Sequence, residues 1–234
     1  MTDYVLVHGA WHGGWCWRRV ADILRARGHR VTTPTMTGLG ERAHLLSPEI
    51  TLTTFGEDLT GHLRFEEVSD VVLVGHSFGG NPISYTAERM GDRIQRLVYF
   101  DAQVVFPGET PASNSAPEDV AIRRQMAHDS SGGLSLPPPP AEAMGISDPA
   151  DASWLEEMMT PHPWRTFETP LEIEQTPGAG KPALYIACTE PVYKPLAWAR
   201  ARAAEIGWDM AEIAAGHDAM ISAPEALADL LEGP

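Results

Sequence analysis

Residues 71–80, VVLVGHSFGG, decide the fold of this chain of 234 residues. The stretch begins with four apolar, mostly β-branched side chains, a run that is typical of a strand buried on both faces of a parallel sheet. The motif G-x-S-x-G follows at once, and the helical spacing of Ile83, Ala87 and Met90 predicts a helix directly after it. A strand, a tight turn and a helix form the context in which this motif indicates a reactive serine.

Ser77 is the candidate nucleophile, because the turn lifts its hydroxyl clear of the predicted sheet. A side chain held in such a strained turn needs small neighbours, and the glycines provide them. The same turn leaves the backbone N–H of Phe78 free at a helix N-terminus, where the helix dipole favours negative charge. Phe78 is therefore a candidate oxyanion donor. The alternative is a serine that only connects two elements.

A second glycine-rich turn, HGAWHGG at residues 8–14, follows the apolar run 4–7. In enzymes with a G-x-S-x-G serine, an H-G-x turn at this place supplies the second oxyanion donor, which here is the N–H of Ala10. The turn lacks the G-x-G-x-x-G spacing of a dinucleotide site. Residues 38–43, GLGERA, fit a relaxed form of that spacing, but they lie beyond their strand and no helix opens on them. We therefore expect no cofactor.

The general base is expected to be a histidine near the C-terminus, because the chain order with this motif is serine, acid, histidine. His217, in the loop between the last predicted strand and the last predicted helix, is the candidate. Asp218 is a poor partner for it, because neighbouring side chains diverge. Positional roles are predicted for the histidines that flank the two turns, which are His8, His12 and His76.

The rest of the chain alternates apolar runs with amphipathic stretches, which predicts an α/β fold with a mostly parallel sheet and right-handed crossovers. Strands are predicted at 4–7, 29–33, 71–74, 94–100, 183–187 and 210–214. Helices are predicted at 17–28, from 53 onward, at 83–91, at 196–206 and after a capping box at 222–225.

Residues 103–180 break this alternation, because they hold twelve of the twenty prolines and little periodicity. A stretch of this length is a functional insertion or is partly disordered. We therefore predict one domain over residues 1–234, with a core at 1–102 and 181–234 and a cap insertion at 103–180, between the fourth and fifth strands.

Composition excludes several classes of partner. With 17 basic and 32 acidic residues the formal charge is −15, which argues against nucleic acid and anionic membranes. No apolar run reaches the ~18 residues of a spanning helix, and the N-terminus does not resemble a signal peptide. Cys16 and Cys188 lie far apart without metal-ligand spacing, so we expect free thiols, no metal and a cytoplasmic protein. The oligomeric state, monomer or homodimer, is left open.

Four segments together resemble the α/β-hydrolase superfamily: residues 5–17 (VLVHGAWHGGWCW), 75–80, 188–190 and 216–220. The similar branch holds plant methylesterases, hydroxynitrile lyases and small bacterial esterases of the carbendazim-hydrolysing type. The resemblance covers most of 4–102 and 182–232. It implies an α/β-hydrolase fold with a six-stranded core and helices on both faces, a pair formed by Ser77 and His217, and oxyanion donors at Ala10 and Phe78.

The chain departs from the lyases of this branch at two positions. They carry a threonine where this chain has Gly9 and a lysine, thought to handle cyanide, where it has Asp218. Methylesterases have glycine at the first position. The resemblance therefore implies ester hydrolysis and makes a lyase the weaker alternative.

The identity of the acid is open. Where the methylesterases place their aspartate, this chain has Pro191. Glu190 precedes it, but a shift of one residue at a strand end turns a side chain to the other face. Asp101 directly follows the apolar run 97–100, a position from which some superfamily members take their acid, and a charge there is costly without a partner. We predict Asp101, with Glu190 as the second candidate.

The sequence thus predicts a serine hydrolase that cleaves small carboxylic esters, carbamates or lactones with a hydrophobic or aromatic part, through an acyl-enzyme on Ser77. The substrate-binding residues are expected to be Gly9, Trp11, Trp154 and Trp164, together with Phe78. A ligand-binding protein that has lost catalysis and a hydroxynitrile-lyase-like enzyme are the alternatives.

Overall fold

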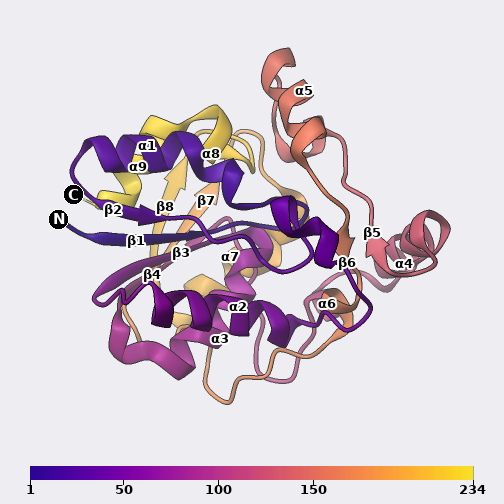
Figure 1. Ribbon diagram of the computed structural model, residues 1–234, viewed down its shortest axis with the longest axis horizontal. Coiled ribbons are helices and arrows are strands. Elements are labelled where there is room, and N and C mark those ends of the chain that lie inside the picture. The colour runs from indigo at the N-terminus through magenta and orange to yellow at the C-terminus, as the bar shows by residue number, and fades with distance from the viewer. Residues whose placement is uncertain (234) are drawn as a thin grey trace.

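The computed structural model describes residues 1–233. Its centre is a six-stranded sheet with the order β2-β1-β3-β4-β7-β8, in which every neighbouring pair is parallel (Figure 1). The strands are β1 (Asp3–Val7), β2 (Arg30–Thr32), β3 (Val71–His76), β4 (Ile94–Phe100), β7 (Ala183–Cys188) and β8 (Asp209–Ile213). The predicted parallel α/β architecture is confirmed.

Helices cover both faces of the sheet (Figure 1). One face is covered by α1 (Arg18–Ala26), α8 (Ala219–Ser222) and α9 (Pro224–Glu232), and the other by α2 (Leu52–Phe65), α3 (Gly80–Met90) and α7 (Ala197–Ile206). Short 3-10 helices lie between these elements, at η1 (Gly14–Trp17), η2 (Gly40–Leu45), η3 (Ser77–Gly79), η4 (Gly91–Arg93), η5 (Pro111–Asn114), η6 (Ala141–Met144) and η7 (Lys194–Leu196).

The strands divide the core into two apolar clusters, because successive side chains point to opposite faces. Leu73 of β3 packs in the cluster beneath α2 and α3, whereas Val72 and Val74 pack in the cluster beneath α1 and α9. Every residue of β3 is buried. This double burial explains why its sequence is a continuous apolar run rather than an alternation of apolar and polar residues.

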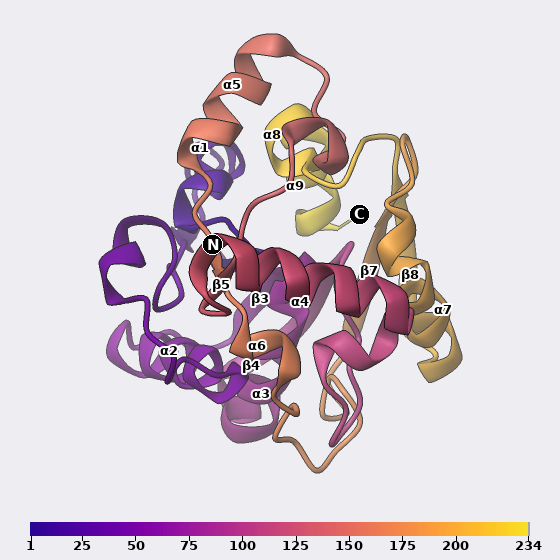
Figure 2. The same ribbon diagram turned by 90° about the vertical axis from the view of Figure 1, so that its right-hand side faces the viewer.

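Residues 103–180 are folded; most of the segment lies beyond the carboxyl ends of the strands, and its last residues return past α3 to the start of β7 (Figures 1 and 2). Figure 2 shows α4 crossing in front of this edge, with α5 above it and α6 below it. The elements of the segment are α4 (Pro117–Ser131), α5 (Pro149–Met158), α6 (Arg165–Glu168) and the antiparallel pair β5 (Ser135–Leu136) and β6 (His162–Pro163). Residues 103–180 are called the cap. That the cap is an insertion into the core domain remains a prediction.

The capping box predicted at 222–225 is wrong. Ser222 is the last residue of α8, and its hydroxyl donates to the carbonyl of Asp218 one turn earlier, at 3.5 Å. Serine in a helix often bonds back to its own turn in this way. The next helix, α9, starts at Pro224 with Ala223 as an N-cap that contributes no side-chain hydrogen bond. Within residues 1–233 no helix has the length and apolar character needed to cross a bilayer.

Two glycines of α2 differ in the space around them, and this difference predicts opposite effects of the same substitution. A Cβ on Gly56 would lie 2.3 Å from the ring of Tyr85 on α3, whereas a Cβ on Gly61 would have nothing within 4 Å. Overpacking costs roughly 1–3 kcal/mol, and alanine in an open helix position is about 1 kcal/mol better than glycine. Gly56→Ala should therefore lower the free energy of unfolding and Gly61→Ala should raise it, as measured by urea denaturation. Equal effects of the two substitutions would contradict the close packing of α2 on α3.

Candidate active site

Three candidate residues meet at the carboxyl edge of the sheet. Ser77 follows β3, Asp101 follows β4, and His217 lies in the loop between β8 and α8. Ser77 and Asp101 both adopt positive φ angles, 53° and 39°, which are uncommon for residues other than glycine. Such backbone strain clusters at functional sites, where the surrounding packing holds it in place.

Ser77, His217 and Asp101 form one chain of hydrogen bonds. The Ser77 hydroxyl lies 2.9 Å from Nε2 of His217, and Nδ1 of the same ring lies 2.6 Å from Oδ2 of Asp101. Because a carboxylate only accepts, Nδ1 carries the proton and Nε2 is left to accept from the serine. The side chains of His217 and Asp101 are only 2% and 8% exposed, so little water competes for these bonds.

The structure does not bring Glu190 to the histidine. Its side chain is exposed, and its backbone N–H donates to the carbonyl of Ala215. Within the described chain, residues 1–233, the Glu190 carboxylate makes no hydrogen bond or ion pair. Of the two acids that the sequence left open, only Asp101 therefore contacts His217.

The two predicted oxyanion donors lie at one cavity. Ala10 and Phe78 both line it together with Ser77. Phe78 is the second residue of the short helix η3, so its N–H is one of the initial amides that have no partner within the helix. Gly9 was predicted to bind substrate, but it is not among the residues that line this cavity. Instead, a Cβ at Gly9 would lie only 2.8 Å from the Cβ of Ser77, so the missing side chain lets the two turns approach each other.

Two aromatic rings hold the imidazole of His217. Tyr193 stacks on it with ring centroids 3.9 Å apart and an angle of 14°. His76 packs at 4.6 Å, and its Nε2–H donates to the backbone carbonyl of His217 at 3.0 Å. Burial keeps the pKa of His76 well below its usual value, so this ring is neutral. The positional role predicted for His76 is consistent with these contacts, whereas Tyr193 carried no signal in the sequence.

His12 and Asp218 form a buried pair behind the site. Nε2 of His12 lies 3.0 Å from Oδ2 of Asp218, and Nδ1 donates to the carbonyl of Ala10 at 2.7 Å. Since both ring nitrogens face acceptors, both carry a proton and His12 is an imidazolium. Burial has the largest single effect and lowers the pKa of His12, but the charge of Asp218 and the hydrogen bonds to Asp218 and Ala10 together outweigh burial, and the pKa is raised. The pair ties the turn that carries Ala10 to the loop that carries His217.

The pKa of Asp218 is shifted in the opposite direction from that of His12. Burial has the largest single effect and raises the pKa of its carboxyl, but the charge and hydrogen bond of His12, together with the nearby His76 and His217, outweigh burial and the pKa is lowered. Its second oxygen, Oδ1, lies 3.7 Å from Nε2 of His76 and has no hydrogen-bond partner among residues 1–233. As predicted, Asp218 does not orient His217.

His76, His217 and Asp218 also form the one group of metal-ligating side chains within the described residues whose donor atoms lie within 4.8 Å of one another. Both ring nitrogens of His217 are already bonded to Ser77 and Asp101, and Nε2 of His76 is bonded to a carbonyl. His217 therefore has no free ligand atom, whereas Nδ1 of His76 and Oδ1 of Asp218 have no hydrogen-bond partner within residues 1–233, so the group holds fewer than three available donors.

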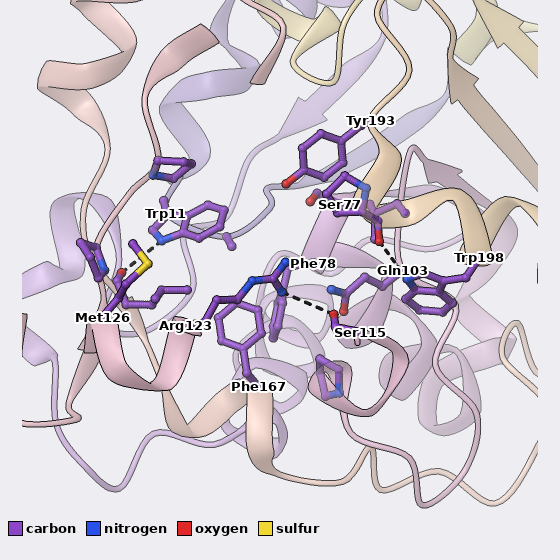
Figure 3. Close-up of a pocket in the computed structure, with 17 residues that line it drawn as sticks. Trp11, Ser77, Phe78, Gln103, Ser115, Arg123, Met126, Phe167, Tyr193 and Trp198 are labelled. Atoms are coloured by element: carbon purple, nitrogen blue, oxygen red, sulfur yellow. Dashed lines mark hydrogen bonds between the residues drawn. The ribbon is translucent and has the colours of Figure 1, made fainter. Parts of the chain in front are cut away.

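The cavity in front of Ser77 has a volume of about 200 Å³ (Figure 3). Trp11 lines it, as predicted, and its indole N–H donates to the carbonyl of Leu136. Most other lining residues come from the cap and from the segment after β7, where no motif marked them. They include Gln103, Ser115, Arg123, Met126, Phe167, Tyr193 and Trp198.

The prediction that Trp154 and Trp164 line the pocket is wrong. Trp154 of α5 packs edge-on against Trp15 at 5.2 Å and beneath the guanidinium of Arg19, on the face of the sheet that α1 covers. Trp164 is 5% exposed and packs on Phe167 in the cluster on the other face. Both rings serve the packing of the cap.

The chain matches known proteins over its whole length. The model of the alpha/beta hydrolase family matches residues 4–230. A carbendazim hydrolyzing esterase of Nocardioides sp. is 38% identical over 99% of this chain and 98% of that protein. A pyrethroid hydrolase of Sphingobium wenxiniae is 30% identical over 99% of this chain and 86% of that protein. Among solved structures, an extracellular alpha/beta-hydrolase from a Paenibacillus species has a TM-score of 0.84 at 23% identity, over 99% of this chain and 98% of that one.

The ionised pair of His12 and Asp218 predicts a pH-dependent stability. The raised pKa of His12 means that its contribution is complete below the unfolded value of ~6.5 and is lost as the pH rises through the folded value. Asp218→Asn should cost about 3–5 kcal/mol near pH 6, because it breaks a buried pair. The cost should shrink toward pH 9, because His12 loses its proton as the pH rises through its raised folded pKa.

Denaturant unfolding at the two pH values measures this difference. Asp209→Asn is the matched control, because Asp209 is exposed at the start of β8 and surface substitutions change stability by about 0.5 kcal/mol or less. A cost of Asp218→Asn that is the same at both pH values is the result that contradicts an imidazolium at His12.

Proposed function

The chain belongs to the alpha/beta hydrolase family, and we propose that it is a serine esterase that cleaves small carboxylic esters through an acyl-enzyme on Ser77. The class of activity, ester hydrolysis, agrees with the full-length relatives, which are named as an esterase and a hydrolase. The single observation that supports the mechanism best is the hydrogen-bonded chain of Ser77, His217 and Asp101. It has the three groups, in the three relative positions, that activate a serine hydroxyl.

In the first half of the reaction, Nε2 of His217 takes the proton of Ser77 while the hydroxyl oxygen attacks the ester carbonyl. The carbonyl oxygen becomes an oxyanion that accepts hydrogen bonds from the N–H groups of Ala10 and Phe78. One such donor typically stabilises the transition state by ~3–4 kcal/mol. His217 then gives its proton to the departing alcohol, which leaves the acyl group on Ser77.

In the second half, water enters in place of the alcohol and His217 takes a proton from it. The resulting hydroxide attacks the acyl-enzyme, the same two amides hold the oxyanion, and the proton returns to Ser77 as the acid leaves. Asp101 acts through the histidine in both halves: it keeps the proton on Nδ1 and stabilises the imidazolium that forms twice per turnover.

The cavity indicates the kind of ester that fits. Its volume of about 200 Å³ suits a small molecule, and its walls are mainly aromatic, proline and aliphatic side chains. The relatives are named for carbendazim and for pyrethroids. We propose that this chain takes small esters, carbamates or lactones that carry a hydrophobic or aromatic part.

The two alternative functions find less support at the site. A lyase of the related branch carries a side chain at position 9, where a Cβ in this protein would lie 2.8 Å from that of Ser77. A binding protein without catalysis has no need of an intact proton relay, and here the relay is hydrogen-bonded from end to end.

Three variants test the proposal through the hydrolysis of a small aryl ester and labelling by a fluorophosphonate probe. Ser77→Ala should abolish both. Asp101→Asn should lower kcat by about 10⁴, because the amide holds the wrong tautomer of His217. Glu190→Gln is the matched control, since Glu190 is exposed and its carboxylate makes no hydrogen bond to the relay within the described residues, and it should keep the wild-type rate.

Other outcomes identify the alternatives. Poor labelling that is the same with and without Ser77 indicates a binding protein. Release of cyanide from an aromatic cyanohydrin by the wild-type protein, without hydrolysis of esters, indicates a lyase. A loss of activity in Glu190→Gln, with Asp101→Asn unimpaired, would show that the acid is assigned to the wrong residue.

A further inference from the structure

Arg123 is the one ionised side chain that lines the cavity in front of Ser77. No carboxylate lines this cavity within the described part of the chain. The protein as a whole carries 32 acidic and 17 basic residues, so a cavity with a lone arginine is opposite in charge to the molecule around it. Figure 3 shows the side chain extending from α4 into the cavity, toward Phe78 and Ser115.

The guanidinium of Arg123 is poorly satisfied by the protein. Its one hydrogen bond among residues 1–233 goes to the hydroxyl of Ser115 at 3.5 Å, which is long, and it makes no ion pair in that part of the chain. The next residue shows the contrast: Arg124 donates from two nitrogens to Glu168, at 2.9 and 2.6 Å, outside the cavity. A guanidinium has five N–H donors, and those of the half-buried Arg123 are left for a ligand.

The charge of Arg123 acts on the same space as the catalytic groups. Burial raises the pKa of the Tyr193 phenol, and the positive charge of Arg123 opposes that rise. Tyr193 is the ring that stacks on His217. Arg123, Tyr193 and Ser77 line the same cavity, so a ligand that fills it can contact the guanidinium and the serine together.

We propose that Arg123 binds a carboxylate of the substrate, so that the preferred substrates are monoesters of small dicarboxylic acids with an apolar or aromatic middle. The inference rests on the proposed esterase function and deepens it. The ester group lies at Ser77, the free carboxylate lies at Arg123, and the apolar middle packs on walls such as Phe78 and Phe167.

A carboxylate fits this arginine better than a neutral acceptor does. A carboxylate accepts two parallel N–H bonds from the planar guanidinium, and the charges strengthen both. The surrounding side chains are apolar, so the attraction is screened less than at an exposed site. A cationic substrate is disfavoured by the same charge, and no acidic residue of the lining compensates for it.

Three methyl esters of one shape test the proposal. Monomethyl terephthalate carries the carboxylate, methyl 4-nitrobenzoate carries a neutral group of the same shape, and methyl 4-methylbenzoate carries an apolar group. Each kcat/KM is divided by the rate constant of the same ester with hydroxide, which removes differences in intrinsic reactivity. The carboxylate ester should exceed both neutral esters by roughly tenfold to a hundredfold.

Variants of Arg123 assign the preference to this side chain. Arg123→Gln should remove the ratio between the carboxylate and the nitro ester, and Arg123→Lys should keep part of it. Arg124→Gln is the matched control, because it removes the same charge from the same helix outside the cavity, and it should leave the ratio unchanged. The thermal unfolding midpoint of each variant shows that it is folded.

A binding measurement separates this inference from the proposed function. Calorimetric titration of Ser77→Ala with monomethyl terephthalate should show binding that is lost in the double variant with Arg123→Gln.

If binding depends on Arg123 but no ester is turned over, the esterase proposal fails and the carboxylate site stands. If neutral esters are cleaved at Ser77 without a carboxylate preference, or Arg123→Gln keeps the preference, the carboxylate site is refuted and the esterase proposal stands. If no ester is turned over or bound, both are refuted.

Discussion

The site depends on the hydrogen bond from Nδ1 of His217 to Asp101, which joins residues 116 positions apart at 2.6 Å. Three neighbouring strands bring the two residues of this hydrogen bond together. Asp101 ends β4, its N–H donates to the carbonyl of Ile186 in β7, and its carboxylate accepts from the N–H of Cys188 at 3.4 Å. The loop with His217 follows β8, the partner of β7 on the other side. The parallel register of β4, β7 and β8 thus brings acid and base together.

The nucleophile is positioned by backbone contacts that leave no room for side chains. A Cβ on Gly75 would lie 2.6 Å from the carbonyl oxygen of Gly79, and a Cβ on Gly79 would lie 2.8 Å from that of His8. Together with the close approach of Gly9 to Ser77, these contacts lock the two turns against each other. The strain of the Ser77 backbone is held by this packing, since relaxing one turn moves the other. The N–H groups of Ala10 and Phe78, the proposed oxyanion donors, are consequently fixed relative to the hydroxyl.

These parts have local signals in the sequence, because their causes are local. The buried run 71–74, the glycines of both turns and the charge of Asp101 at the end of an apolar strand are each visible without a partner. The sequence could not decide between Asp101 and Glu190 as the partner of His217, because that contact depends on how the ends of neighbouring strands align in the sheet. The sequence around Trp154 has no hydrophobic periodicity, so it does not indicate whether this side chain points into the cavity or into the core. Arg123 and Tyr193 reach the cavity from α4 and from the loop after β7, so no spacing joins them to the motif.

The charges around Ser77 are arranged in layers. Behind Ser77, Asp218 is paired with His12, and Asp101 is bonded to the imidazole of His217, which becomes charged in the proposed reaction. The carboxylates of Asp218 and Asp101 thus each contact a histidine and do not line the cavity. In front of it, Arg123 is positive and without an acidic partner in the lining. An ester carbonyl bound at Ser77, as proposed, would therefore lie in a local field that favours negative charge, although the whole protein has a formal charge of −15. The same field would favour both the proposed oxyanion and the proposed carboxylate of the substrate, because both are negative charges in a cavity that no carboxylate of residues 1–233 lines.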